Sequence, residues 1–451
     1  MARQARSELA KSPPAAVTTT SHSRATELWL LVVAWTVVTG FYVLMSLATK
    51  GTLPARLGVF LVIIVAVTLA MHAAIRRYVP RSSQVLLPVA TLLNGIGWVE
   101  IARWNPTRAG YQAFWFIVSG VIVVLALKLV SSIRDLDRYR YLTLTAAMLL
   151  MLSPFIPHFG ENINGARLWV AVGPLSFQPI ELAKVLLVFF FASYFAANRE
   201  ILSTPTQRFG GVLIVPPKVL VPIVAAWGIA LMILGGENDI GFAMLLFALF
   251  FALLWLTTGL KSYVMIGVGL FVAGALAAYQ LFPQVHQRVS LWFDPWSATS
   301  NQLARGWYSL ANGGVVGTGL GLGSAGHYVG EITSDMIFAG LGEELGFLGI
   351  ILILSLFAVF IGEGFRIAQR SHSDFVRLTA TGLTATLGLQ AFFIMGGILR
   401  LVPFTGITLP FMAYGGSSLF ANYLIVALLL RISHENAEER RGGDVVAVTF
   451  D

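Results

Sequence analysis

Residues 240–257 read IGFAMLLFALFFALLWLT and contain no charged side chain. A helix needs about 20 predominantly apolar residues to cross the hydrocarbon core of a bilayer, so this run is long enough for one span. Similar runs recur along the 451 residues, of which 57% are hydrophobic and only 12% are charged. Soluble domains carry about 25% charged residues. The pattern predicts an all-α polytopic membrane protein, because helices satisfy their own backbone hydrogen bonds in lipid.

The lengths of the apolar runs, and the charges that interrupt them, predict about twelve transmembrane helices. Their predicted positions are near 28–47, 56–75, 84–103, 112–131, 141–157, 181–197, 218–236, 240–257, 262–282, 335–362, 377–398 and 411–431. Residues 1–26 are basic and rich in Ser, Thr, Pro and Ala, so we expect a disordered cytoplasmic tail there. Residues 434–451 are expected to form a second cytoplasmic tail.

The distribution of Lys and Arg predicts the orientation in the cytoplasmic membrane. Loops on the same side as the N-terminus hold more of these residues, beginning with Arg76, Arg77 and Arg81. Cytoplasmic loops carry the excess of positive charge, so both termini are predicted to be cytoplasmic. This asymmetry accounts for most of the net charge of +8, and no nucleic-acid partner is expected. The chain has no cysteine, which excludes disulfides and thiolate metal sites.

Two predicted outside loops, 158–180 and 283–334, stand out by length and composition, and the second is too long to be a simple connector. Long loops on a rigid scaffold often carry binding and catalytic residues. The second loop contains FDPWSATSNQ (293–302), whose carboxylate is Asp294. This stretch raises the question of whether Asp294 is a catalytic acid or base, or only part of a turn before Pro295.

Charged side chains in or beside apolar spans are costly and are therefore functional candidates. Glu181 and Lys184 in FQPIELAK share one helix face. They form part of a site, or they only cap the helix with a local ion pair. Glu237 and Asp239 in GGENDIGFAM belong to a site or to a solvated turn.

Three further acids, Asp335, Glu343 and Glu344 in SDMIFAGLGEELG, are predicted to enter the outer leaflet along one helix. The segment PFTGITLPFMAYGGSS (403–418) combines Pro, Gly and Ser at membrane depth, where non-helical backbone must be buried or line a cavity. The glycine run GTGLGLG (317–323) lacks the context of a nucleotide loop, so a flexible loop is expected. From the residues alone, a transporter and a lipid-handling enzyme both fit.

Four stretches of the sequence resemble motifs of the SEDS family (shape, elongation, division and sporulation), which includes RodA, FtsW and SpoVE. They are NGARLWVAVGPLSFQPIELAK (164–184), ENDIG (237–241), SDMIFAGLGEELGFLG (334–349) and LVPFTGITLPFMAYGGSSLFAN (401–422). The resemblance implies a ten-helix membrane domain over 84–433, preceded by two additional helices in 27–83. It is greatest to the actinobacterial RodA branch.

The resemblance implies a peptidoglycan glycosyltransferase that polymerises lipid II at the outer membrane face, alongside a class B penicillin-binding protein. It also implies a divalent cation, Mg²⁺ or Mn²⁺, and no organic cofactor. The residues that correspond to substrate-binding positions are Arg167, Trp169, Gln178, Glu181, Lys184, Glu237, Asp239, Gln302, Asp335, Glu343, Glu344, Tyr414, Ser417 and Ser418.

The chain departs from the family at the position of the proposed catalytic base. The family reads P-x-x-D-P-x-G-x-G-Y-Q there, whereas Ala298 stands in place of that Asp and the piece before Gln302 is about two residues shorter. A methyl group accepts no proton, so Asp294 becomes the nearest candidate base. Two alternatives to polymerisation follow. One is a catalytically impaired lipid II-binding partner or regulator of a penicillin-binding protein, and the other is a flippase or transporter of lipid-linked precursors.

Overall fold

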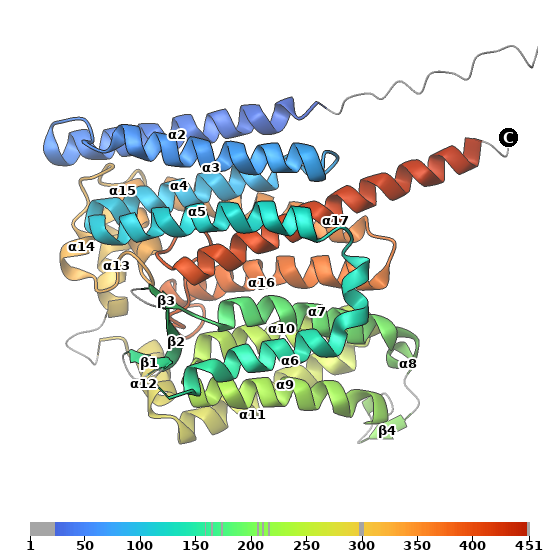
Figure 1. The fold of residues 1–451 in the computed structure, drawn as a ribbon. Helices are drawn as coiled ribbons and strands as arrows, with labels where there is room; N and C mark the ends of the chain where they lie inside the picture. The colour runs from blue at the N-terminus through green and yellow to red at the C-terminus, as the bar shows by residue number, and fades with distance from the viewer. Residues whose placement is uncertain are drawn as a thin grey trace, which may run out of the picture.

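The computed structural model describes residues 23–448 except 158, 164–165, 173–174, 205–206, 210–211, 215–216 and 297–301. Within this part of the chain, long helices lie side by side in one bundle (Figure 1). The bundle helices are α2 (Ala25–Lys50), α3 (Leu57–Tyr78), α4 (Leu86–Trp104), α5 (Pro106–Leu129), α6 (Arg140–Leu152), α7 (Ile180–Ala197), α9 (Pro217–Glu237), α10 (Ile240–Thr258), α11 (Lys261–Leu281), α15 (Ile337–Gln369), α16 (Asp374–Ile398) and α17 (Gly416–Val448).

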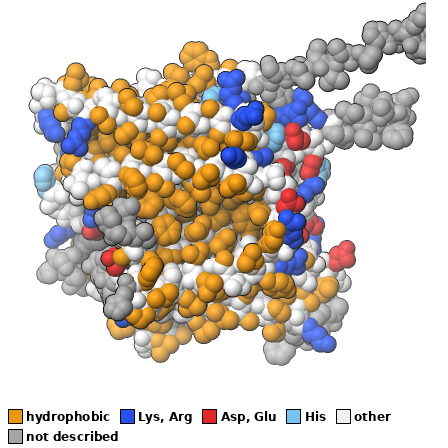
Figure 2. All heavy atoms as spheres, viewed as in Figure 1, with side chains coloured by type: hydrophobic (Ala, Val, Ile, Leu, Met, Phe, Trp, Pro, Cys, Tyr) orange, Lys and Arg blue, Asp and Glu red, His pale blue; other side chains and the backbone are white. Residues whose placement is uncertain are grey.

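Ten of these helices are long and apolar enough to cross a membrane, counting only the described residues. The other two predicted spans correspond to α4, which carries Glu100 and Arg103, and to α6, which has only 13 residues. The helix α6 is followed by the short turns of η2 (Ser153–Phe155), and η1 (Arg134–Tyr139) precedes it. Hydrophobic side chains cover the middle of the visible face, and charged side chains gather toward the ends of the helices (Figure 2). The predicted polytopic helical membrane fold is confirmed.

The loop predicted at 158–180 contains a small antiparallel sheet. Its strands are β1 (Gly160–Ile163), β2 (Ala166–Val172) and β3 (Leu175–Phe177), in the order β1-β2-β3. A second hairpin pairs β4 (Gln207–Phe209) with β5 (Val212–Ile214). The strands were missed because β1, β3, β4 and β5 have only three or four residues each, and β2 (ARLWVAV) lacks the alternation of polar and apolar residues that identifies a strand.

The predicted outside loop 283–334 is also more ordered than expected. It contains α12 (Pro283–Phe293), α13 (Gln302–Gly313) and α14 (Ala325–Tyr328). Together with β1–β3 these helices gather at one end of the bundle (Figure 1). The start of α2 and the last described turns of α17 lie at the opposite end (Figure 1). The structure therefore places both ends of the described chain on the same side of the bundle. The short helix α8 (Arg199–Ser203) lies near that side as well.

The N-terminal helices α2 and α3 pack along one edge of the bundle, α2 against α4 and α3 against α5. The helix α2 begins at Ala25, inside the predicted tail, and Arg24 is buried. Arg24 donates hydrogen bonds to the carbonyl oxygens of Pro80 and Ser82, each at 3.1 Å, and forms an ion pair with Glu27. Because Pro80 and Ser82 lie in the α3–α4 connection, their hydrogen bonds with Arg24 attach the start of α2 to the rest of the bundle.

The helix α15 contains a break at Gly346, which has φ 65° and ψ −167°. This conformation is accessible essentially only to glycine. A Cβ atom at this position would also lie 2.2 Å from the backbone nitrogen of Gly317. The break lets the glycine run 317–323 pass close to the helix, which explains how a non-helical segment packs at this end of the bundle.

Candidate functional site

Charged and polar residues from five separate segments converge at the end of the bundle that carries β1–β3 and α12–α14. We call this set the polar end cluster, and it comprises Glu181, Lys184, Asp239, Arg288, Asp335 and Gln390. The members come from α7, the α9–α10 connection, α12, the segment before α15, and α16. The sequence predicted four of these residues as site residues and missed Arg288 and Gln390.

Lys184 is held inside the bundle by two partners. Its ammonium group forms an ion pair with Glu181 one helical turn earlier and donates to Gln390 Oε1 at 2.8 Å. Both charged side chains are almost fully buried. The amide of Gln390 in turn donates to the carbonyl oxygen of Thr408 at 3.0 Å. The local ion pair considered from spacing is therefore present, but it lies at the contact of α7 with α16 rather than on a surface.

The acids of ENDIG are buried rather than solvated. Glu237 is 1% exposed and Asp239 is 7% exposed. Asp239 precedes α10, and its Oδ1 accepts a hydrogen bond from the Phe242 N–H at 2.9 Å. Burial raises the pKa of Asp239 to about 6, while this hydrogen bond and the Arg288 charge oppose the rise. The turn is therefore part of the polar end cluster, and the solvated alternative does not hold.

Arg288 interacts electrostatically with both Asp239 and Asp335. Its guanidinium donates to the carbonyl oxygens of Phe404 at 3.3 Å and Thr405 at 2.5 Å. The next residue, Gly406, has φ +71°, and a Cβ built on it would lie 3.5 Å from Asp335 Oδ2 and 3.6 Å from Arg288 Nη2. The glycine therefore allows the acid and the arginine to approach the broken segment.

In the sequence, Arg288 lies in the predicted outside loop 283–334 and was not identified as a site residue. A signal for its role was present, because Pro283 favours the start of a helix and Arg288 lies on an amphipathic stretch that follows it. That signal predicts a helix, but it does not identify the carboxylates that the helix approaches. Those come from residues 239 and 335, about fifty positions away on either side.

Asp335 lies two residues before α15, so it is not on the same helix as Glu343 and Glu344. Its side chain is half-buried. Burial raises the pKa of Asp335 to about 7, the neighbouring Glu331 adds to the rise, and Arg288 and Arg108 oppose it. Asp335 is therefore a carboxyl group that exchanges its proton near neutral pH.

An adjacent set of contacts connects α5 to the segment before α15. Arg108 forms an ion pair with Glu331 at 2.9 Å and donates to Thr333 Oγ1 at 2.7 Å. Burial opposes ionisation of Glu331, but the hydrogen bond and charge of Arg108 outweigh it and lower the pKa of Glu331. The carbonyl oxygen of Thr333 accepts a hydrogen bond from the Tyr414 N–H at 2.8 Å. The predicted site residue Tyr414 thus borders the segment that carries Asp335.

The predicted residues Gln178, Ser417 and Ser418 connect α7, α17 and the broken segment. Ser417 Oγ accepts a hydrogen bond from the Gln178 N–H at 2.8 Å. Ser418 Oγ lies 2.8 Å from Thr408 Oγ1. These contacts fix the start of α17 beside the residues that hold Lys184, so their geometry positions the polar end cluster.

Glu343 and Glu344 form a second set of contacts, with the glycine run and with the residues that follow it. Glu343 Oε2 accepts hydrogen bonds from the Ala325 N–H at 2.7 Å and from Ser309 Oγ at 3.1 Å. Glu344 accepts from the Gly321 N–H at 2.9 Å and forms an ion pair with Arg103. The N–H groups of Thr318 and Gly319 also donate to the carbonyl oxygens of Glu343 and Glu344. The expectation of a flexible loop at 317–323 is therefore wrong, because α15 holds the backbone of this run.

The remaining predicted residues lie on the periphery. Arg167 is exposed on β2, and Trp169 is paired with Glu161 of β1. The amide of Gln302 donates to the carbonyl oxygen of Gly330 at 2.8 Å. Asp294 is exposed at the end of α12, and its Oδ1 accepts a hydrogen bond from the Trp296 N–H at 3.3 Å. This is the turn geometry that the Asp-Pro pair suggested.

Ala298, at the family's base position, lies outside the described residues.

The arrangement of metal-ligating side chains is known for the described residues only. No group of three or more His, Cys, Asp or Glu side chains converges among them. Asp239 and Asp335 instead share the positive charge of Arg288. At phosphate-handling sites, Mg²⁺ is commonly bound by one or two carboxylates together with waters and substrate phosphate oxygens. The divalent cation that the resemblance to the family implies stays a prediction.

The sequence and the fold match known proteins over most of the chain. A family model described as "Cell cycle protein", FTSW_RODA_SPOVE, matches residues 99–438. Peptidoglycan glycosyltransferase RodA of Mycobacterium tuberculosis is 38% identical over 377 residues, covering 80% of each protein. A probable peptidoglycan glycosyltransferase FtsW of Legionella pneumophila is 31% identical over 350 residues, covering 74% of this chain and 86% of that protein.

Solved structures share the fold. The crystal structure of the rod shape determining protein RodA of Thermus thermophilus has a TM-score of 0.58 at 25% identity, covering 79% of this chain and 97% of that one. A chain of a peptidoglycan synthase complex has a TM-score of 0.63 at 23% identity, covering 79% of this chain and 98% of that one. By the length and identity of these matches, the chain belongs to the FtsW, RodA and SpoVE family of multi-pass membrane proteins.

Proposed function

We propose that this protein is a peptidoglycan glycosyltransferase that polymerises lipid II, the undecaprenyl-pyrophosphate-linked disaccharide pentapeptide, at the outer face of the cytoplasmic membrane. Family membership and the names of its relatives support this activity. The structural observation that carries the proposal is Arg288, which is shared by Asp239 and Asp335 next to the Lys184–Glu181 pair. The cluster combines a proton acceptor with cations at one end of a membrane bundle.

The proposed reaction has one proton transfer and one displacement. A carboxylate removes the proton from the 4-hydroxyl group of the acceptor sugar, and the hydroxyl oxygen forms a bond to the anomeric carbon of the donor. The bond between that carbon and the pyrophosphate oxygen breaks, and undecaprenyl pyrophosphate leaves with the electron pair. A general base and positive charge near the pyrophosphate therefore serve the reaction.

Asp335 suits the role of the base. A catalytic base works best when its pKa lies near the operating pH, and the pKa of Asp335 is raised to about 7. Its half-buried side chain remains partly accessible. Asp294, the candidate from the sequence, is exposed and accepts a hydrogen bond within its own turn. We assign proton removal to Asp335 and a capping role to Asp294.

Arg288, Lys184 and Arg167 suit the stabilisation of the pyrophosphate. Arg288 and Lys184 are fixed by hydrogen bonds to Thr405 and Gln390, so little reorganisation is needed when charge develops. Arg167 is exposed on β2 and can reach a ligand from the aqueous side. Arginine presents several donors in a planar fork that matches phosphate oxygens.

The orientation and the partner are part of the same proposal. We place both termini in the cytoplasm, because Lys and Arg predominate in the loops on that side. The polar end cluster then faces outward, where lipid II would be polymerised. We propose a class B penicillin-binding protein as the partner, in cell wall elongation or division, from the resemblance of the sequence to RodA and FtsW.

A second candidate function is lipid II binding without polymerisation, in a partner or regulator of the penicillin-binding protein. The observation that favours it is Ala298, which replaces the family's proposed base. This candidate keeps the cations of the cluster and removes the proton transfer. The two functions therefore differ in turnover and share lipid II affinity.

The test uses the purified full-length protein and lipid II, alone and with a class B penicillin-binding protein whose transpeptidase site is blocked by a β-lactam. Glycan strands resolved by gel electrophoresis are expected for the wild-type protein. The Asp335→Asn variant should retain lipid II binding and lose most of the polymer. Lipid II binding with no polymer in the presence of the partner would establish the second candidate instead.

A further inference from the structure

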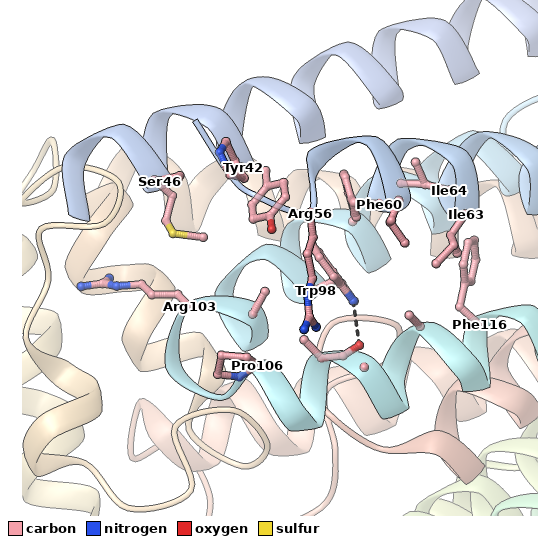
Figure 3. A pocket seen from close by; sticks show the side chains of 18 of the residues that line it. Tyr42, Ser46, Arg56, Phe60, Ile63, Ile64, Trp98, Arg103, Pro106 and Phe116 are labelled. Atoms are coloured by element: carbon pink, nitrogen blue, oxygen red, sulfur yellow. Dashed lines mark hydrogen bonds between the residues drawn. The ribbon is translucent and has the colours of Figure 1, made fainter. Parts of the chain in front are cut away.

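A cavity of about 560 Å³ lies between the N-terminal helices α2 and α3 and the helices α4 and α5 (Figure 3). We call it the hairpin pocket. Its wall includes Tyr42, Phe60 and Trp98, and its charged lining consists of Lys50, Arg56 and Arg103. The helices α2 and α3 precede residues 99–438, which match the family model. One side of the pocket is thus formed by helices that are additional to the family domain.

Small residues and aromatic residues together shape the pocket. Gly110 and Ala113 of α5 line it, and a Cβ on Gly110 would meet nothing within 4 Å. Across from α5, Phe60 stacks on Trp98 with ring centroids 4.3 Å apart, and Tyr42 packs edge-on against Trp98 at 5.3 Å. The Trp98 indole N–H donates to the carbonyl oxygen of Ala109 at 3.0 Å, so its polar group is already satisfied. The wall therefore presents apolar surface to an occupant.

Two cations lie where the pocket reaches the end of the membrane spans. Lys50 is the last residue of α2, and Arg56 immediately precedes α3. Both are exposed, and Arg56 extends toward the side of the pocket that holds Trp98 (Figure 3). The ion pairs found within the described part of the chain involve other Lys and Arg residues. An apolar pocket with unpaired cations at headgroup level matches an anionic amphiphile.

The volume of about 560 Å³ accommodates one fatty acyl chain. Lipid acyl chains also surround the bundle, so the occupant is available directly from the bilayer.

We propose that the hairpin pocket binds a bilayer phospholipid with a net negative headgroup, such as phosphatidylglycerol. One acyl chain occupies the aromatic pocket, and the phosphate of the headgroup contacts Arg56 and Lys50. Arg103, which also lines the pocket, forms the ion pair with Glu344 that holds the glycine run. The site thus adjoins the packing of α4 against α15, and it does not depend on the proposed reaction.

The experiment uses the full-length protein reconstituted in nanodiscs that contain equal amounts of phosphatidylglycerol and phosphatidylcholine. After extraction into detergent and washing, the retained phospholipid is identified by native mass spectrometry. Each Lys or Arg beside the headgroup favours an anionic phospholipid over a zwitterionic one by roughly fivefold. We expect the Lys50→Gln/Arg56→Gln variant to lose most of the preference for phosphatidylglycerol, by about twentyfold.

Two further variants distinguish binding in the pocket from non-specific attraction of anionic lipid to positive charge. Gly110→Phe fills the pocket while leaving both cations in place, and it should reduce retention of either phospholipid. Arg76→Gln/Arg77→Gln removes two exposed arginines from the opposite end of the same helical hairpin and should leave retention unchanged. Equal loss in this control and in the Lys50/Arg56 variant would overturn the proposal.

Two other results would also overturn it. One is a wild-type protein that retains no phosphatidylglycerol. The other is displacement of the phospholipid by an equimolar amount of undecaprenyl phosphate, which would identify a polyprenyl lipid as the occupant.

Discussion

Arg288 of α12 donates to the carbonyl oxygen of Thr405 at 2.5 Å, and this contact joins the long outer segment to the broken segment before α17. The non-helical backbone there needs internal partners, because lipid offers none. Arg288 supplies one of them and also faces Asp239 and Asp335. A single arginine therefore satisfies the backbone and sets the charge balance of the polar end cluster.

Replacing Arg288 tests this double role. Arg288→Lys keeps a positive charge but loses the planar fork, and Arg288→Gln loses the charge. We expect Arg288→Gln to lower lipid II polymerisation by a factor of roughly 10² to 10³, as for loss of a transition-state donor, with a smaller loss for Arg288→Lys. Polymerisation rates with purified protein and partner provide the measurement.

Arg305 is a suitable control for Arg288. It lies on α13 in the same outer segment, and its side chain donates to the carbonyl oxygen of Tyr328 at 3.0 Å in an exposed contact. Arg305→Gln should change the polymerisation rate by less than about threefold, because exposed polar contacts contribute little. Equal losses in the two variants would remove the specific role of Arg288.

The pKa of Asp335 predicts a pH dependence of activity. The carboxyl is protonated below about pH 7 and cannot accept a proton, so kcat/KM should rise as pH increases through about 7. Arg288 lowers the pKa of Asp335, so the Arg288→Gln variant should show the rise at higher pH. A pH profile of kcat/KM measures both effects. A wild-type profile that is flat between pH 6 and pH 8, or one unchanged in Arg288→Gln, would contradict the assignment.

The raised pKa of Asp335 also makes folding stability depend on pH, and stability should decrease as pH rises, whereas activity should increase. The folded protein retains the proton of Asp335 up to about pH 7, whereas the usual pKa is 3.8. Its contribution to stability is therefore fully present below about pH 4 and decreases as pH rises toward 7. Asp335→Asn should be more thermostable than the wild-type protein at pH 8, even though it is less active.

The helical membrane fold could be predicted because span length and charge are local properties of the sequence. The run at 240–257 corresponds to α10, which extends from Ile240 to Thr258. Boundaries failed where helices continue past the apolar run, as α17 does to Val448. The strands β1–β3 also escaped prediction, because their pairing depends on contacts between short segments.

The site was only partly predictable because its contacts join distant segments. Spacing alone suggested the Glu181–Lys184 pair, which the structure shows. Nothing local indicates that Gln390 of α16 completes it at 2.8 Å. Likewise, the adjacent acids Glu343 and Glu344 suggested a binding site, but their carboxylates accept hydrogen bonds from the backbone N–H groups of Ala325 and Gly321. A buried carboxylate has the same sequence signature in either role.

Glu343 is predicted to be a major determinant of stability. Its carboxylate accepts hydrogen bonds from Ser309 Oγ and from the backbone N–H groups of Ser324 and Ala325, all within 3.1 Å. Removing it leaves buried donors unsatisfied, so Glu343→Ala should cost about 3–5 kcal/mol. Thermal unfolding followed by size-exclusion chromatography measures the loss. Glu363→Ala, near the other end of α15, should cost less than about 1 kcal/mol, because its partner Arg366 is exposed.

The orientation of the bundle can be tested with single cysteines, since the chain contains none. Asn312→Cys lies on α13 at the polar end cluster side, and Arg370→Cys follows α15 at the opposite side; both positions are exposed. In intact cells, a membrane-impermeant maleimide should label residue 312 and should label residue 370 only after permeabilisation. Labelling in the reverse order would invert the proposed topology and move the cluster to the cytoplasm.

The last prediction concerns Asp294 and Ala298. The side chain of Asp294 caps the turn at Trp296 and is exposed, so Asp294→Asn keeps an oxygen acceptor and should change polymerisation by less than about threefold. Asp335→Asn should lower it by roughly 10² to 10⁴, the usual effect of losing a general base. If Asp294→Asn lowers the rate as much as Asp335→Asn does, with lipid II binding retained, Asp294 rather than Asp335 is the base. Ala298→Asp restores the family's carboxylate, and it should add little to a protein that already uses Asp335. A large gain in that variant, over a nearly silent wild-type protein, would show that catalysis was lost at residue 298.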